Sequence, residues 1–416
     1  MWGGVALLAL PVAYAGLLGW LRGGWQRNLT PLTPLSLGEG GTSFSLSSSK
    51  GEDLKLELET SPSSFKEGGL GDEVPPRAAA PTFSVLVAAR DEAAALPQLL
   101  RDLAAQTLPA THFEVLIADD HSADGTAALV AAAAQTSTFS LRLVALPPNQ
   151  TGKKAALLAA LQAARSPWLV CTDADCRVGP GWLVAYAAQL ARAPRANFIS
   201  GPVLLTGPAT LFHTLIGLEF AGLVGVGAAC IGRGQPTMCN GANLAYRRAA
   251  FEAVGGFADN AHIASGDDEF LLHKIHAAFP GTAHFLADRA AVARTAAPAT
   301  MRGLLRQRVR WASKWRHYRS AAPRRLALLV LGANVALAAG VGAGLLAPAL
   351  WPWVGAAWAI KLGADAWFLV PALRFFGRRR WLWGLLPLQV LYAPYALAVG
   401  AAGWGGGYVW KGRAVR

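Results

Sequence analysis

Four clusters of charged residues follow one another along the middle of the chain: DDHSADGT at Asp119 to Thr126, DAD at Asp173 to Asp175, GDDEF at Gly266 to Phe270, and QRVRW at Gln307 to Trp311. Paired carboxylates bind divalent cations, a further carboxylate can act as a base, and a fixed cation can stabilise developing negative charge. These are the groups that transfer from a nucleoside diphosphate requires. The elements around them must therefore bring the four clusters together.

The DAD cluster is the candidate metal site. Asp173 and Asp175 are one residue apart after the β-rich segment WLVCT, and Mg²⁺ or Mn²⁺ is usually held by one or two carboxylates together with substrate phosphates. A DxD pattern alone is more often a solvated turn, but its place after a strand favours the metal site. Lys153 and Lys154 begin a predicted helix, where cations and free N–H groups can approach phosphates. A solvated basic helix start explains these lysines equally well.

Other charged residues follow the first two predicted strands. Arg90 and Glu92 come after FSVLVAA, and Asp119 and Asp120 come at the end of FEVLIADD. Carboxylates there can accept hydrogen bonds from a nucleobase and a ribose, because ligands of open α/β sheets bind at the carboxyl ends of the strands. The acidic residues are also of the types that cap helices, and the two roles are compatible.

Two further clusters lie on predicted helices. GDDEFLLHKIHAAF has acidic residues where a helix starts, which favours Asp267 and Asp268 at the helix N-terminus. In QRVRW, Gln307, Arg310 and Trp311 lie on one helical face at positions i, i+3 and i+4. Taken alone, QRVRW is more typical of an amphipathic helix on a membrane surface.

The elements that carry these clusters alternate between β-rich and Ala/Leu-rich segments from Phe83 onward. FSVLVAA, FEVLIAD, LRLVAL and WLVCTDAD are each followed by a helical stretch, which predicts βαβ units and a parallel sheet. The fold class is therefore α/β. The four cysteines of the chain form no CxxC pair, which indicates reduced thiols in a cytosolic domain rather than a zinc site.

Apolar segments flank this domain. The following stretches each approach the ~20 residues that cross a bilayer: Val5 to Leu21, Leu326 to Leu350, Trp351 to Leu373 and Trp381 to Trp404. The first has no basic residue before it and Arg22 after it, which favours an uncleaved anchor with a cytoplasmic C-terminal end. If the last stretch crosses fully, the basic tail lies outside against the usual bias, so a re-entrant hairpin is the alternative.

Two other kinds of segment lie near the membrane: basic segments beside the apolar spans, and an apolar segment that contains ionisable residues. The net charge of +13 is concentrated beside the apolar spans, at Arg302 to Arg325 and Arg374 to Arg380, which indicates an anionic membrane surface and no nucleic acid. Thr210 to Ile231 is apolar but contains His213 and Glu219. Because ionisable groups are costly inside a bilayer, we predict a helix that lies against the membrane or the acceptor groove.

Taken in order, the motifs resemble membrane-integrated members of glycosyltransferase family 2, the group of cellulose, hyaluronan and chitin synthases and ceramide glucosyltransferase. VAARDEA resembles the family's VPARNE, DDHSADGT its DDxSxDGT, DAD its DxD, GDD its ED position, and QRVRW its QxxRW. GANLAYRRAAFEAVGGF and the terminal WKGR also resemble family segments. Among the departures, Ala88 stands where proline is common, and Gly266 precedes the acidic pair where Thr or Ser is frequent.

The resemblance implies a GT-A-like, Rossmann-type nucleotide-sugar-binding domain, with Asp268 as general base. The implied catalytic set is Asp267, Asp268, Gln307, Arg310 and Trp311. The implied nucleotide-sugar-binding set is Ala88, Arg90, Glu92, Asp119, Asp120, Lys153, Lys154 and Asp173. Asp173 and Asp175 would hold Mg²⁺ or Mn²⁺, and the donor expected is a UDP-sugar.

We therefore expect five parts: an N-terminal transmembrane helix over 1–24, a low-complexity flexible linker over 25–80, the GT-A-like domain over 81–300, an amphipathic interface helix over 301–322, and a C-terminal region of about three hydrophobic segments over 323–416. The expected activity is metal-dependent, inverting transfer of a sugar to a lipid or glycan acceptor at the inner membrane, with a cytoplasmic catalytic domain. The alternatives are a processive polysaccharide synthase and a non-catalytic membrane scaffold that keeps the fold.

Overall fold

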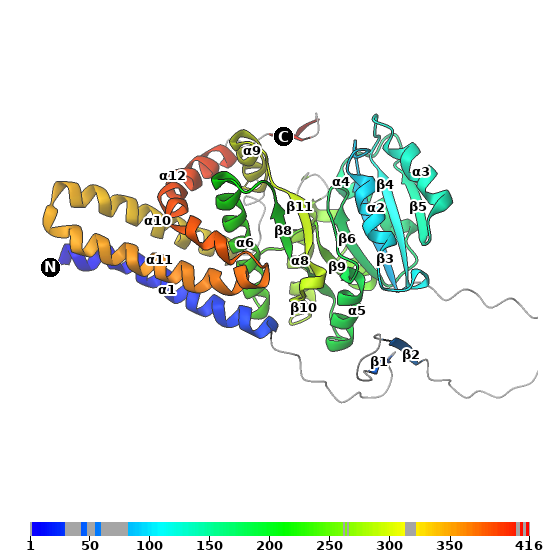
Figure 1. The fold of residues 1–416 in the computed structure, drawn as a ribbon, viewed down its shortest axis with the longest axis horizontal. Coiled ribbons are helices and arrows are strands. Elements are labelled where there is room, and N and C mark those ends of the chain that lie inside the picture. The colour runs from blue at the N-terminus through cyan, green and yellow to red at the C-terminus, as the bar shows by residue number, and fades with distance from the viewer. Residues whose placement is uncertain are drawn as a thin grey trace, which may run out of the picture.

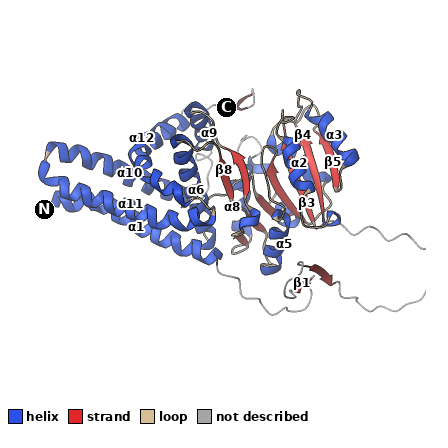
Figure 2. Cartoon of the chain, in the orientation of Figure 1, coloured by secondary structure: helices blue, strands red, loops and turns tan. Residues whose placement is uncertain are grey.

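The computed structural model describes residues 2–29, 43–47, 55–59, 82–260, 263, 266–312, 322–404, 408–410 and 413–415. An α/β domain occupies one side of the described chain, and a group of long helices occupies the other (Figure 1). The strands of the main sheet are confined to the first part (Figure 2). The predicted α/β fold class is confirmed.

The main sheet has seven strands in the order β10-β7-β9-β6-β3-β4-β5. Four of them are parallel neighbours, namely β3 (Phe83–Ala89), β4 (Phe113–Asp119), β5 (Ser140–Ala145) and β6 (Trp168–Asp173). The others are β7 (Phe198–Ser200), β9 (Leu244–Arg247), which is antiparallel to β6 and β7, and β10 (Ala283–Phe285). A second, two-stranded parallel sheet joins β8 (Val203–Thr206) and β11 (Ala293–Ala296).

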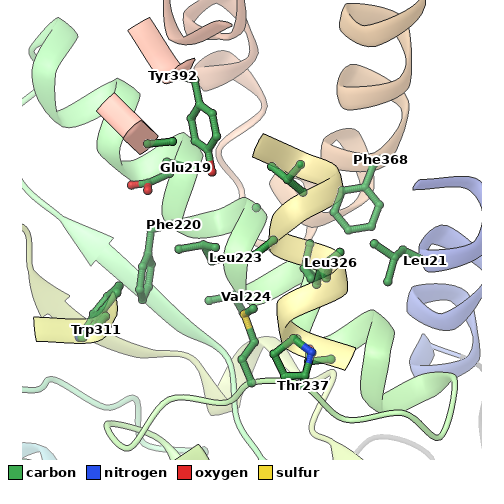
Figure 3. A pocket seen from close by; sticks show the side chains of 18 of the residues that line it. Leu21, Glu219, Phe220, Leu223, Val224, Thr237, Trp311, Leu326, Phe368 and Tyr392 are labelled. Carbon is green, nitrogen blue, oxygen red and sulfur yellow. The ribbon is translucent and has the colours of Figure 1, made fainter. Parts of the chain in front are cut away.

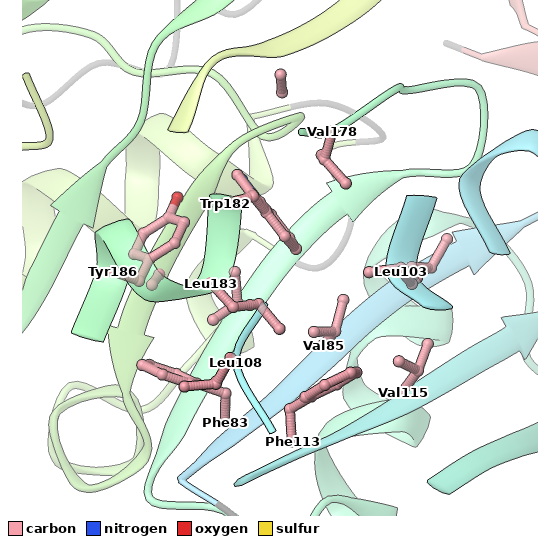
Figure 4. Close-up of a cluster of buried hydrophobic side chains, with 14 of the residues drawn as sticks. Phe83, Val85, Leu103, Leu108, Phe113, Val115, Val178, Trp182, Leu183 and Tyr186 are labelled. Carbon is pink, nitrogen blue, oxygen red and sulfur yellow. The ribbon is translucent and has the colours of Figure 1, made fainter. Parts of the chain in front are cut away.

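Helices cover both faces of the main sheet, because apolar side chains of successive strand residues point to opposite faces. Val85 and Val115 point to a core with α2 (Leu96–Ala104), α3 (Thr126–Thr136) and α5 (Trp182–Arg192) (Figure 4). Leu86 and Leu116 point to the opposite core with α4 (Lys153–Ala163), α7 (Arg248–Ala253) and α8 (Asp267–Ala278). Successive strand residues face opposite sides, so both faces of these apolar strands are buried. The sheet is therefore a rigid platform for the loops at its edge.

Among the described residues, five helices are long and apolar enough to cross a membrane, by length and composition. They are α1 (Trp2–Leu29), α6 (Leu211–Gly232), α10 (Ala322–Leu346), α11 (Trp351–Phe375) and α12 (Leu385–Trp404). The four predicted apolar spans coincide with α1, α10, α11 and α12. The fifth, α6, crosses the domain-facing ends of α1 and α11 (Figure 1), where Gly24 approaches the Ala229 carbonyl and Gly225 approaches Phe368. That α6 lies against the membrane or the acceptor groove stays a prediction.

The remaining elements are shorter. The helix α9 (Met301–Ala312) is the described half of the predicted interface helix, and residues 313–321 lie outside the described residues. Most of the predicted linker over 25–80 also lies outside them, apart from the end of α1 and the antiparallel pair β1 (Ser43–Ser47) and β2 (Lys55–Glu59). A second antiparallel pair joins β12 (Tyr408–Trp410) and β13 (Arg413–Val415). Short 3-10 helices span Ala110–His112, Ala258–Asn260, Arg289–Ala291, Pro348–Leu350 and Arg379–Gly384.

Candidate active site

The parallel strands bring two of the four predicted clusters, DDHSADGT and DAD, to one edge of the sheet. Ala89 at the end of β3 pairs with Asp119 at the end of β4, and Ala88 pairs with Asp173 at the end of β6. Ala88 itself is half-buried, one residue before the end of β3. The carboxylates at Asp119 and Asp173, more than fifty positions apart in the chain, therefore lie on either side of the same strand.

Hydrogen bonds connect the first two loops at this edge. The Asp91 carboxylate accepts from the Ala123 backbone N–H at 2.8 Å, and the Glu92 N–H donates to Thr126 Oγ1 at 2.9 Å. Asp91 and His121 have left-handed backbones, with φ of 51° and 56°. Such conformations are strained for non-glycine residues and persist only when surrounding bonds hold them. The loops are therefore a preformed part of the site, and the Glu92 side chain is half-buried between them.

Asp119 and Asp120 are buried and differ in their partners. Asp120 Oδ2 accepts from the Gly152 N–H at 3.0 Å and lies 3.7 Å from the Arg90 guanidinium. Asp119 Oδ2 accepts from the Ser122 N–H at 3.2 Å, whereas Asp119 Oδ1 is buried and has no hydrogen-bond partner among the described residues. A buried unpaired acceptor is costly, so Asp119 Oδ1 is suited to a donor on a ligand.

Lys153 links the DAD cluster to the start of α8. Its Nζ lies 2.6 Å from Asp173 Oδ1 and 3.6 Å from Asp267 Oδ2. These three residues form the Lys153 cluster. Burial alone would lower the pKa of Lys153, but the charges of Asp173, Asp267 and Asp268 raise it above its usual value. The lysine therefore stays a cation at the point where the acidic clusters meet.

Lys154 points elsewhere. Its Nζ donates to the backbone carbonyls of Asn260 and Ile263 at 2.5 and 2.8 Å, and to Asn260 Oδ1 at 3.0 Å. These bonds hold the segment that precedes α8. Both lysines were predicted to approach phosphates, and the helical turn directs their neighbouring side chains about 100° apart. Only Lys153 lies with the carboxylates in the described contacts.

The DAD cluster presents oxygen donors for a cation. Ligand atoms of Asp173, Asp175 and Cys176 lie within 4.8 Å of one another. Desolvation, followed by the like charges of Asp173 and Glu92, raises the pKa of Asp175, as expected where carboxylates converge. Burial also raises the pKa of the Cys176 thiol, which keeps it protonated. The set therefore fits a hard, oxygen-preferring cation held by two carboxylates.

The GDDEF cluster begins α8, as predicted. Gly266 precedes the helix with a left-handed backbone at φ 83°. Asp268 Oδ2 accepts from the Gly241 N–H and Oδ1 from the Glu269 N–H, both at 2.8 Å. A Cβ added at Gly241 would lie 3.2 Å from Lys153 Nζ and 3.3 Å from Asp267 Oδ2. The turn at Gly241 thus lies within contact distance of the base candidate and the Lys153 cluster.

Asn243 organises the turn that carries Gly241, a role that sequence reasoning did not assign. Its side chain is fully buried, and its Oδ1 accepts from Trp182 Nε1 at 2.9 Å and from Tyr186 OH at 2.8 Å. Its Nδ2 donates to the carbonyls of Pro202 and Ala291, both at 2.8 Å. An Asn two residues after a glycine in GANLAY was the signal available in the sequence.

In QRVRW the buried cation is Arg308, which the sequence analysis did not select. Arg308 is 5% exposed and forms two hydrogen bonds with Glu219 of α6, the shorter at 2.6 Å. Its NH1 donates to Gln307 Oε1 at 2.7 Å, and its guanidinium lies 4.3 Å from the Trp311 ring. Arg310 is half-buried on the same helix. An isolated Glu within an apolar segment was the signal that a basic partner existed.

A cavity of about 450 Å³ lies between α9 and the apolar helices (Figure 3). Asp268, Arg308 and Trp311 line it on the side of the α/β domain, and Glu219 lines it from α6. The remaining wall is largely apolar and comes from α1, α6, α10, α11 and α12, including Leu21, Leu223, Val224, Leu326 and Phe368. Asp268 therefore borders both the Lys153 cluster and an apolar cavity.

The chain was compared with known families and solved structures. Residues 84–255 match the family described as Glycosyl transferase family 2. A mannosyltransferase from Pyrobaculum calidifontis, solved with GDP-Man and Mn²⁺, has a similar fold, with a TM-score of 0.52 at 20% identity over 93% of this chain and 97% of that chain. TarS residues 1–349 from S. aureus give 0.41 at 17% identity, over 80% and 95%. Mannosyl-3-phosphoglycerate synthase from Rubrobacter xylanophilus gives 0.37 at 17%, over 59% and 74%. No curated protein matches the chain in sequence.

Proposed function

We propose that the protein transfers a sugar, with inversion, from a nucleoside-diphosphate sugar to a lipid alcohol at the membrane, since residues 84–255 match the family described as Glycosyl transferase family 2. One observation carries this proposal. Asp268 lies beside the Lys153 cluster on one side and lines the apolar cavity on the other. A base in this position can serve a donor bound at the sheet edge and an acceptor held among the apolar helices.

The donor would bind along the sheet edge. Asp119 Oδ1 would accept a hydrogen bond from the nucleobase, and Lys153 would pair with a diphosphate oxygen. Asp173 and Asp175 would hold Mg²⁺ or Mn²⁺, which when bound neutralises charge on the diphosphate. We expect a UDP-sugar as donor, and GDP-mannose is the second donor to test because the similar mannosyltransferase was solved with it.

Transfer would take place at the mouth of the cavity. Asp268 would accept the proton of the acceptor hydroxyl while that oxygen attacks the anomeric carbon. The bond from that carbon to the diphosphate breaks, and the nucleoside diphosphate leaves with the bonding electrons. Arg310 would stabilise the charge on the leaving group, and Trp311 would contact the acceptor or the sugar from the cavity wall. An α-linked donor would give a β-linked product.

The wall of the cavity supports a lipid acceptor over a growing polysaccharide. Side chains such as Leu223, Val224 and Phe368 offer no partners to the hydroxyl groups of a sugar chain, and unpaired buried hydroxyls are costly. Acyl or isoprenoid chains are compatible with the same wall. For topology we propose a multi-pass protein of the inner membrane with the α/β domain in the cytoplasm, which the basic segment Arg374 to Arg380 supports.

The direct test uses purified protein in detergent, supplemented with a lipid extract and a panel of nucleotide sugars. Release of nucleoside diphosphate is measured with Mg²⁺ or Mn²⁺ and again with excess EDTA, and lipid products are separated by mass. Asp268→Asn is expected to lower kcat/KM by about 100-fold or more, the range of general-base catalysis. Asp259→Asn, at an exposed carboxylate 3.8 Å from Lys274, is the matched control. Wild-type protein that releases no nucleotide with any donor would refute the proposal.

A further inference from the structure

A buried ion pair joins the QRVRW helix to the apolar helices. The Arg308 guanidinium of α9 and the Glu219 carboxylate of α6 are 5% and 9% exposed. Tyr395 of α12 donates to Glu219 Oε1 at 3.1 Å. The three residues therefore connect one helix of the catalytic side with two helices of the apolar group, and all three line the cavity that Asp268 also borders.

The guanidinium is engaged on its edge and on its face. Its Nε and NH2 donate to the two Glu219 oxygens at 3.3 and 2.6 Å, and its NH1 donates to Gln307 Oε1. The Trp311 ring lies against its face, with 4.3 Å from Cζ to the ring centroid. Trp311 in turn contacts Phe220 of α6, with ring centroids 6.1 Å apart. Only a planar, five-donor group can satisfy an in-plane carboxylate and a stacked indole at once.

Energetics argue against stability as the role of this pair. Two charges removed from water lose most of their mutual attraction to desolvation, and apolar replacements of similar volume are often as stable or more stable. What the charged pair adds over an apolar pair is a defined orientation for the groups bound to it. Those groups are Trp311, which lines the cavity, and Gln307, one helical turn before it on α9.

We propose that Arg308 is a positioning residue for acceptor use: held by Glu219 and by Gln307, it orients Trp311 in the wall of the acceptor cavity. The inference rests on the proposed function, because it assumes that the acceptor enters this cavity. This role of Arg308 is separate from that of Arg310, which would stabilise the charge on the leaving group. Among the described contacts, Arg308 touches none of the residues proposed to bind the donor at the sheet edge.

Two reactions of the same protein separate acceptor use from donor use. Transfer to lipid and transfer to water, measured as nucleotide release without lipid, share the donor and the cation but not the acceptor. For Arg308→Met we expect kcat/KM for the lipid to fall by about 30-fold or more, since displacements near 1 Å cost about 100-fold. The donor KM and the rate of transfer to water are expected to stay within about twofold. Arg308→Lys is expected to recover only part of the loss, because it keeps the charge without the planar fork.

A double variant distinguishes loss of acceptor positioning from loss of stability. Arg308→Met with Glu219→Leu replaces both charges by apolar groups, so its Tm is expected to return to within a few degrees of wild type. Transfer to lipid should stay low in this variant. Recovery of lipid transfer together with Tm, or an equal fall of both reactions in Arg308→Met, would overturn the assignment. Wild-type protein without any nucleotide release would instead refute the proposed function itself.

Discussion

Replacing Gly241 by alanine is expected to reduce activity while leaving the fold intact. Gly241 does not have a left-handed backbone, so alanine is conformationally acceptable there. The added Cβ would lie 3.2 Å from Lys153 Nζ, 3.3 Å from Asp267 Oδ2 and 3.5 Å from Asp268 Oδ2. The first two separations are shorter than an ordinary carbon contact of about 3.5 Å. Lys153 and Asp267 must therefore move by a few tenths of an ångström.

The size of the effect follows from those displacements. A misplacement of about 1 Å at an active site costs about 100-fold in rate, so a few tenths are expected to cost about 3- to 10-fold in kcat/KM. Gly241→Val places further carbons among the same groups and is expected to cost about 100-fold or more. The free energy of unfolding is expected to change by less than about 1 kcal/mol in Gly241→Ala, because alanine also restricts the unfolded chain.

The assay measures metal-dependent nucleotide release and thermal unfolding for wild type, Gly241→Ala and Gly241→Val. Gly179→Ala is the matched control, since its Cβ would meet only the Ala290 carbonyl, at an ordinary 3.6 Å. The reasoning fails if Gly241→Ala retains full activity. It also fails if the valine variant is no worse than the alanine variant, or if the loss follows Tm across the series.

Three other expectations concern buried charges. Glu114 is fully buried. Burial raises the pKa of its carboxyl, but hydrogen bonds from Ser84 and Arg165 bring that pKa below its usual value near 4.5. The contribution of Glu114 to stability is therefore complete above that pH and is lost as the pH falls through the folded-state pKa. We expect Glu114→Gln to lower the free energy of unfolding by about 3–5 kcal/mol at pH 7, a difference that calorimetry should see shrink below pH 4. Asp119→Asn should weaken nucleotide binding by about 10- to 100-fold in a calorimetric titration, the worth of one charged hydrogen bond, with Tm nearly unchanged. Lys361→Met should destabilise the helices by about 3–5 kcal/mol, because Asp365 loses its cationic partner at 2.8 Å and keeps only the hydrogen bonds from Tyr14 and Gln389 among the described contacts. A second change, Asp365→Leu, should restore Tm in detergent.

Local patterns in the sequence were sufficient for the architecture. Alternation of β-rich and helical segments predicted the parallel strands β3, β4, β5 and β6, because strands buried on both faces must be continuously apolar. The lengths of the apolar runs predicted α1, α10, α11 and α12 as long helices, because each run approaches the thickness of a bilayer. The acidic start of α8 was visible because carboxylates favour helix N-termini.

Local sequence patterns did not predict which charged residues pair with one another in the site. Lys153 and Lys154 are adjacent and chemically identical, yet only Lys153 meets Asp173, because the rotation of one helical step sends Lys154 to Asn260. In QRVRW, the spacing placed Arg310 with Gln307, whereas the buried ion pair belongs to Arg308.

The sequence by itself determined the types of chemistry available: the carboxylates, the cations, the strands that deliver them to one edge and the apolar helices beside them. Tertiary structure alone decided which carboxylate borders the apolar cavity and which arginine is buried. Those choices depend on contacts between segments far apart in the chain, such as Arg308 with Glu219 and Asp268 with Gly241. Burial and pairing of charge are properties of the folded surroundings, and local residue patterns do not contain them.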